Sequence, residues 1–176
     1  MSDFTSRIGT EGLSESELER YERQLILSNW SVAKQQLIKS AKVAISAKLP
    51  SALLYLAGAG VGTIVVTDAE EADAQLVTHA AAINPDICVR RWNNNSDQGE
   101  LTAQISIEKE KGFPDFARPI AKISYRPAEE IISLVDDVSE RKFRLASHGS
   151  EITHWNLLAG SLSAIIFLKW RGGLLS

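Results

Sequence analysis

Short apolar runs alternate with helix-length segments between Val43 and Val89. The run 62–68 is the clearest of them, being β-branched and almost wholly apolar, as in a strand that is covered on both faces. Strands joined by connections of about a dozen residues or more pair in parallel, because only a long crossover returns the chain to the same end of the sheet. The alternation therefore predicts an α/β fold, with a Rossmann-like, mostly parallel sheet and flanking helices.

Start and stop signals predict where the helices lie. Ser14 and Glu17 have the spacing of a capping box, which marks the beginning of a helix. Pro50 is suited to the first turn of a helix and Gly60 to its end. The helices expected from these signals and from periodicity span 14–26, 31–38, 50–59, 71–83, 127–134 and 151–171, and the further strands 43–45, 87–89, 104–108, 121–125 and 143–146.

Composition excludes several classes of protein. The 176 residues, of which 44% are hydrophobic and 23% charged, suit a globular chain, and we expect a flexible leader at 1–12 followed by a single domain at 13–176. A net charge of −3 argues against a nucleic-acid partner, which needs a basic surface. The N-terminus has no apolar signal core, and no apolar run reaches the length of about 18 residues that a membrane span needs. We therefore expect a soluble, cytoplasmic protein with no membrane partner.

The sequence offers no disulfide framework and no metal site. Cys88 is the single cysteine, and no cysteine or histidine pair has the spacing of zinc ligands. We expect Cys88 to be a small buried core residue. The apolar residues of 155–170 are too numerous for one narrow helix stripe, so the surplus apolar face is expected to contact another subunit.

Residues 14–68 resemble the ThiF/MoeB family, the bacterial relatives of the enzymes that activate ubiquitin-like modifiers. The segment 20–27, RYERQLIL, matches the family's opening motif RYxRQLxL, and the segment 55–62, YLAGAGVG, matches YLAxAGVG. Weaker matches follow in the same order, with 82–86 similar to the family's RINP segment and 160–162 to its C-terminal GSL. The resemblance implies a ThiF/MoeB-type fold in shortened form, with two N-terminal helices packed outside the sheet.

Members of this family use ATP and Mg²⁺ to adenylate the C-terminal glycine of a ubiquitin-like or sulfur-carrier protein. In these proteins the phosphates of ATP bind to a loop with the motif GxGGLG, whose glycines let backbone N–H groups approach the phosphates closely. The corresponding segment here, 45–51, has no glycine, is about three residues shorter and carries Pro50, which has no N–H to donate. Lys48 remains as the residue of this loop that can meet a phosphate, and a solvated loop lysine is the alternative interpretation.

Two acidic residues match further parts of the family's ATP site. Asp68 ends the run 62–68 and matches the acid that binds the ribose, although a helix N-cap or a turn is an equal alternative. Asp136 loosely matches the Mg²⁺-binding acid of a TDN motif, and the alternative is an exposed acidic turn. The family's SNLxRQ segment and its following lysine have no counterpart, because the INP segment comes too soon after Asp68.

Arg23 is the functional residue of the opening motif that the resemblance carries over. In the family, the second arginine of RYxRQ reaches across a dimer to the partner subunit's ATP, and an arginine supplied in trans stabilises charge on transferring phosphates. An arginine retained without a phosphate loop resembles the inactive half of the heterodimeric activating enzymes. A solvated or ion-paired helix residue is the alternative interpretation.

These observations predict a degenerate ThiF/MoeB-like protein that is not catalytically active alone, needs no cofactor and acts as a dimeric or accessory subunit. Its expected partner is a second copy or an active homologue, with a ubiquitin-like or sulfur-carrier protein as a further partner. Two alternatives stay open. One is an adenylyltransferase that binds ATP and Mg²⁺ through a rebuilt site with Lys48, Asp68 and Asp136. The other is a module that binds a small molecule or peptide at the sheet edge.

Overall fold

Seven strands form one sheet in the computed structural model, which describes residues 12–67, 74–92, 101–107, 121–145 and 152–174, without the side chains of 152–157. The order across the sheet is β3-β2-β1-β4-β5-β6-β7. The first five strands run parallel, and the last two are antiparallel to their neighbours. The expected mostly parallel, Rossmann-like sheet is therefore confirmed. The strands are β1 (Lys42–Ser46), β2 (Thr63–Thr67), β3 (Cys88–Arg91), β4 (Ala103–Ile107), β5 (Ala121–Arg126), β6 (Ile131–Asp136) and β7 (Glu140–Arg144).

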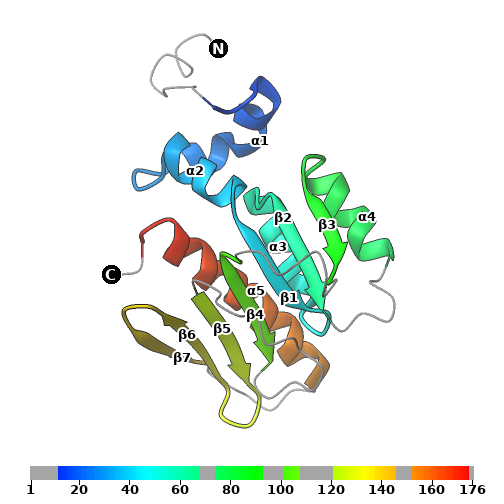
Figure 1. The fold of residues 1–176 in the computed structure, drawn as a ribbon, viewed down its shortest axis with the longest axis vertical. Helices are drawn as coiled ribbons and strands as arrows, with labels where there is room; N and C mark the ends of the chain where they lie inside the picture. The colour runs from blue at the N-terminus through cyan, green and yellow to red at the C-terminus, as the bar shows by residue number, and fades with distance from the viewer. Residues whose placement is uncertain (1–11, 68–73, 93–100, 108–120, 146–151, 175–176) are drawn as a thin grey trace.

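The helices divide into two groups (Figure 1). They are α1 (Glu15–Leu25), α2 (Val32–Lys39), α3 (Pro50–Ala59), α4 (Ala74–Ile83) and α5 (Ile152–Arg171). α3, α4 and α5 share one core with alternate strand residues such as Ile45, Ile64 and Ile105, so they cover one face of the sheet. α1 and α2 lie beyond the end of the sheet, as expected, and pack around Tyr21 and Leu25.

The helix signals in the sequence hold in the structure. Ser14 Oγ accepts a hydrogen bond from the Glu17 N–H, and Glu17 Oε2 accepts one from the Ser14 N–H, so the capping box is complete. Pro50 begins α3, and Gly60 ends it with φ of 91°. A Cβ at residue 60 would also lie 2.7 Å from the Tyr21 ring, so both the backbone and the packing require glycine there.

Two expectations were wrong. The segment 127–134, expected as a helix, is a turn followed by β6, whose Ile132 and Leu134 face the core while Ser133 faces the other side of the sheet. A short apolar run fits either period, and pairing with β5 selects the strand. Cys88 is exposed rather than buried, because β3 is an edge strand with a neighbour on one side only.

The apolar side chains of α5 pack against other elements of the same chain. This helix packs against α3, α2 and strands β4, β5 and β6, so it needs apolar side chains around much of its circumference. Among the described residues of α5, Leu158 is the large apolar side chain that stays exposed, at 43%. No helix in the described ranges is long and apolar enough to cross a membrane.

Candidate functional site

The connection between β1 and α3 lies at the point of the sheet where the strand order reverses. The chain moves from β1 to β2 and β3 on one side and then returns to β4 on the other side of β1. In open α/β sheets, ligands bind at such a point, beyond the carboxyl ends of the strands. Ser46 and Thr67, the last residues of β1 and β2, are paired. A ThiF/MoeB-like phosphate site is therefore expected beyond the carboxyl ends of these two strands.

The main chain of this connection donates its hydrogen bonds within the protein. The Ala47 N–H donates to the Thr67 carbonyl oxygen at 3.1 Å, and the Leu49 N–H donates to the Ser46 carbonyl oxygen at 3.0 Å. The Lys48 N–H donates to Ser46 Oγ at 3.1 Å. Pro50 follows and has no N–H. The donors at residues 47–49 are therefore already engaged.

The first turn of α3 is also covered by α5. Leu49 is fully buried and supplies no side-chain cap to the helix. A Cβ placed at Gly160 would lie 2.5 Å from Ser51 Oγ and 3.1 Å from the Ala52 nitrogen, so α5 approaches this turn closely. The Lys48 side chain is exposed at the same edge. Asp68 directly follows Thr67 and lies outside the described residues.

Asp136 lies at the opposite end of the strands, level with the amino ends of β4 and β5. It pairs with Ala121, the first residue of β5, which pairs with Ala103, the first residue of β4. Asp136 is thus level with the beginnings of the parallel strands, whereas Lys48 lies beyond the end of β1. Three strand spacings, about 14 Å, also separate β6 from β1. The structure therefore does not bring Asp136 together with Lys48.

The oxygens of Asp136 are used in the turn between β6 and β7. Oδ1 accepts hydrogen bonds from the backbone N–H groups of Val138 at 3.0 Å and Ser139 at 2.7 Å. Oδ2 accepts one from Trp170 Nε1 at 3.1 Å, which links the hairpin to α5. These backbone N–H groups, together with the Ser139 hydroxyl and the indole, hold the pKa of Asp136 below its usual value despite desolvation.

The segment that matches RYxRQ packs α1 onto the rest of the protein. Arg20 donates to Asn84 Oδ1 at 2.8 Å and to Asp86 Oδ2 at 2.9 Å, Tyr21 is buried, and Gln24 Nε2 donates to the Gly58 carbonyl oxygen at 3.2 Å. Arg23 differs from these three residues. It is exposed and makes no hydrogen bond or ion pair with any other residue in the described ranges.

Comparison with known proteins decides the family. No family model matches the sequence. The chain is 31% identical over 136 residues to the adenylyltransferase and sulfurtransferase MOCS3 of Anopheles gambiae, and the match covers 73% of this chain and 30% of MOCS3. The chain is of the ThiF/MoeB type. It spans less than a third of the length of this relative.

Solved structures show the same fold as this ThiF/MoeB-type chain. E. coli MccB in complex with MccA-N7isoASN has 15% sequence identity and a TM-score of 0.62, over 97% of this chain and 75% of MccB. PaaA has 18% identity and a TM-score of 0.62, over 93% of this chain and 77% of PaaA. MccB has also been solved with ATP, and that structure has a TM-score of 0.59 and 15% identity, over 98% of this chain and 75% of MccB.

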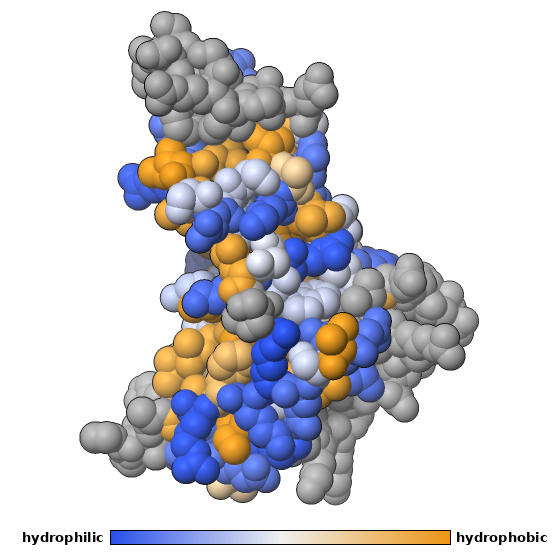
Figure 2. Space-filling model, turned by 90° about the vertical axis from the view of Figure 1, so that its left-hand side faces the viewer, coloured by the Kyte–Doolittle hydropathy of each residue, from blue (hydrophilic) through white to orange (hydrophobic). Residues whose placement is uncertain are grey.

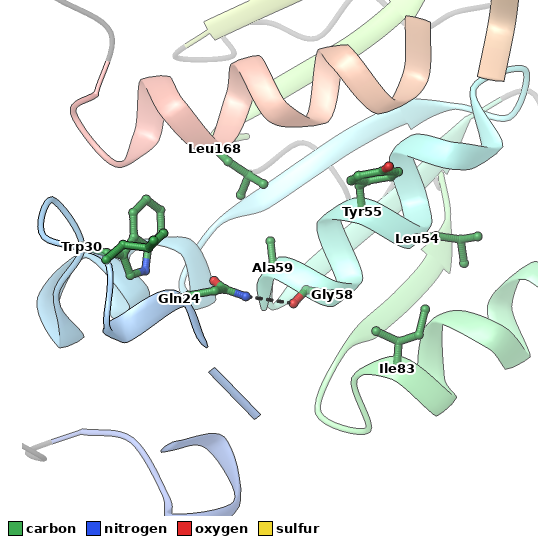
Figure 3. Close-up of a pocket in the computed structure, with 9 residues that line it drawn as sticks. Gln24, Trp30, Leu54, Tyr55, Gly58, Ala59, Ile83 and Leu168 are labelled. Atoms are coloured by element: carbon green, nitrogen blue, oxygen red, sulfur yellow. Dashed lines mark hydrogen bonds between the residues drawn. The ribbon is translucent and has the colours of Figure 1, made fainter. Parts of the chain in front are cut away.

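The ThiF/MoeB-type chain also has an apolar groove that its sequence did not reveal. The groove has a volume of about 530 Å³ and lies between α1, α3, α4 and α5 (Figure 3). Its lining comes from four separate helices and the α1–α2 connection, so no single motif announces it. Among the described residues, no cluster of three or more histidine, cysteine or acidic side chains is arranged to hold a metal ion.

Proposed function

We propose that this ThiF/MoeB-type chain is a non-adenylating subunit that pairs with an active homologue and supplies Arg23 to the partner's ATP. The observation that carries the proposal is the engagement of the N–H groups of residues 47–49 within the chain. A phosphate cradle needs several free backbone donors that point at one place. Here, a bound phosphate would first have to break these bonds.

The cost of rebuilding the loop explains why the isolated chain is not expected to bind ATP. Each intramolecular hydrogen bond contributes about 0.5–1.5 kcal/mol, and a donor left unpaired in a buried place costs more. Leu49 is fully buried, so opening the loop would also expose an apolar side chain. Lys48 supplies a charge at this edge, but a single exposed lysine does not replace a ring of fixed backbone donors.

The exposure of Arg23 supports a role on another molecule. Its neighbour Gln24 is bound to Gly58, which lies eight positions after Pro50, or about 12 Å along α3. Gln24 thus ties this part of α1 to the end of α3 that is opposite the loop at 47–49. Arg20 donates to Asn84 and Asp86, which leaves Arg23 as the unpaired guanidinium of the motif within the described ranges.

The alternative of an active adenylyltransferase is weakened by the position of Asp136. Lys48 and the chain leaving Thr67 toward Asp68 share one edge of the sheet, so these two residues remain candidates for a rebuilt nucleotide site. Asp136 lies at the opposite edge, with its oxygens engaged in a turn. An enzyme of this design would therefore need a metal ligand from elsewhere.

Two measurements test the proposed function. Calorimetric titration of the isolated chain with Mg-ATP is expected to show no binding at micromolar concentrations. Adding the chain to an active ThiF/MoeB-type homologue from the same organism is expected to raise that homologue's ATP turnover, and Arg23→Ala should abolish the gain. Glu22→Ala, an exposed neighbour on α1, is the matched control and should keep it.

The outcomes separate the alternatives. Micromolar Mg-ATP affinity of the isolated chain would favour the adenylyltransferase. A gain of turnover that Arg23→Ala leaves intact would remove the role in trans while keeping the accessory subunit. No effect on the homologue and no nucleotide binding would contradict the proposal as a whole. A second copy of the chain as partner, a carrier protein as further partner and a cytoplasmic location are also proposals.

A further inference from the structure

The apolar groove has the volume and the lining of a small-molecule site. Such sites have volumes of about 300–1,000 Å³ and are lined mainly by apolar and aromatic side chains. The groove, at about 530 Å³, lies within this range. Its large apolar side chains are those of Leu27, Trp30, Leu54, Tyr55, Ile83 and Leu168. Seen from the side, the molecule narrows below the α1–α2 pair, and apolar residues are visible at that level (Figure 2).

The lining of the groove also limits the charge of a ligand. Among the residues that the structure describes, no lysine, arginine, histidine or acidic side chain lines it. A charged group buried there would lose its hydration and find no counter-ion, which is costly. Trp30 and Tyr55 contribute two aromatic rings, and flat aromatic molecules pack well against such rings. The groove therefore suits a neutral, aromatic ligand.

Most polar groups around the groove bond within the protein. The Gly58 carbonyl oxygen accepts from Gln24 Nε2 at 3.2 Å. The Ala59 carbonyl oxygen accepts from Gln35 Nε2 at 2.8 Å, and Trp30 Nε1 donates to Gln35 Oε1 at 2.9 Å. The last carbonyls of α3 and the indole nitrogen are thus engaged, so a ligand needs few polar groups of its own.

Gln24 carries an acceptor that stays free. A carbonyl oxygen only accepts hydrogen bonds, so the nitrogen of the Gln24 amide must face Gly58 and the amide oxygen must face away from it (Figure 3). Within the described part of the chain, this oxygen accepts no hydrogen bond. A single N–H or O–H group on an apolar ligand would bond to it, and one such bond fixes how the ligand is oriented.

We propose that the groove binds a neutral, aromatic small molecule whose N–H or O–H group donates a hydrogen bond to Gln24 Oε1. Binding covers apolar surface that is otherwise in water, because Leu27 is 58% exposed, Tyr55 51% and Ile83 43%. The groove includes Gly58 and Ala59, at the end of α3 opposite the loop at 47–49. This binding site goes beyond the proposed function, because it needs neither ATP nor a partner subunit, and either can fail without the other.

The test uses the full chain and the probe N-phenyl-1-naphthylamine, which is neutral and aromatic, has one N–H group and fluoresces strongly in apolar surroundings. Its titration should give a saturable rise in fluorescence. The 8-sulfonate of the same molecule keeps the rings but adds a negative charge, and it should bind about tenfold more weakly. The N-methylated molecule lacks the N–H group and should bind about fivefold more weakly.

Two substitutions place a carboxylate in the groove. Leu27→Asp and Ile83→Asp lie at exposed positions on different sides of it, and each should weaken binding of the neutral probe by about tenfold. Val138→Asp is the control, because Val138 is 91% exposed on the β6–β7 turn and does not line the groove. It should leave binding unchanged, and circular dichroism should show that each variant is folded.

Several outcomes would overturn the proposal. They are no binding of the neutral probe, equal binding of the sulfonate or of the N-methylated molecule, and binding that both groove variants leave unchanged. Light scattering of the chain alone gives one more: a dimer that Leu27→Asp converts to a monomer would show that a second copy occupies the groove instead.

Discussion

The side-chain nitrogen of Gln35 donates a hydrogen bond of 2.8 Å to the carbonyl oxygen of Ala59, at the end of α3. The other end of the same amide accepts one of 2.9 Å from Trp30 Nε1. Gln35 is fully buried, so α2 satisfies a carbonyl that the end of α3 would otherwise leave without a partner. This bond and that from Gln24 to Gly58 fix the N-terminal helices, and with them Arg23, on the rest of the protein.

Replacing Gln35 should therefore destabilise the whole chain. Gln35→Leu keeps the size of the side chain but leaves Trp30 Nε1 and the Ala59 carbonyl oxygen unpaired. We expect the free energy of unfolding to fall by about 2–3 kcal/mol, measured by urea denaturation. The exposed Glu22→Ala variant should change it by less than about 0.5 kcal/mol. Equal stability of wild type and Gln35→Leu would mean that these bonds contribute little.

The two arginines of α1 should behave differently on substitution. Arg20→Ala removes the bonds to Asn84 and Asp86 and is expected to lower the free energy of unfolding by about 1–2 kcal/mol. Arg23→Ala removes an exposed side chain with no hydrogen bond or ion pair in the described ranges and should change stability by less than about 0.5 kcal/mol. Urea denaturation of both variants measures the contrast, and a similar loss in both would show that Arg23 has a structural role.

Two helical glycines should respond with opposite signs to alanine. At Gly160 a new methyl group would lie 2.5 Å from Ser51 Oγ and 3.1 Å from the Ala52 nitrogen, so Gly160→Ala should cost about 1–3 kcal/mol of stability through overpacking. At Gly58 the nearest atom is Ile83 Cγ2 at 3.6 Å, so Gly58→Ala should stabilise α3 by about 0.5–1 kcal/mol. Thermal unfolding of the pair checks both signs, and stabilisation by both would contradict close contact between α5 and α3.

The β6–β7 turn should weaken in acid. Because the pKa of Asp136 is lower in the folded chain than in the unfolded chain, its carboxylate stabilises the fold above the unfolded pKa of about 3.9. That contribution is lost as the pH falls through the folded value. Asp136→Asn should thus be less stable than wild type at neutral pH, with a difference that shrinks below about pH 4. Thermal unfolding of both proteins across this range tests it, and a difference that does not vary with pH would oppose this account.

Local features in the sequence were enough to predict most of the fold. The capping box at Ser14, the ends of α3 at Pro50 and Gly60, and the buried strand β2 each depend on residues only a few positions apart. The apolar run 131–134 fits the period of a helix and that of a strand equally well, and the expected helix was wrong. Pairing with β5 makes this run a strand.

The candidate site was predictable only in part. The lack of glycine in 45–51 is visible in the sequence, but the internal use of the N–H groups at 47–49 appears only once Thr67 lies beside them. Nothing local separates Arg20 from Arg23, and the residues that distinguish them, Asn84 and Asp86, lie more than sixty positions away.

The sequence by itself determined the alternation of strands and helices, the helix ends and the absence of a glycine-rich loop, because these depend on backbone preferences and hydrogen bonds between near neighbours. Only the tertiary structure decided that Asp136 lies at the opposite sheet edge from Lys48, that Cys88 is exposed, and that four helices enclose an apolar groove. Strand order and helix packing bring distant segments together, and the edge, face and neighbours of a residue follow from those contacts.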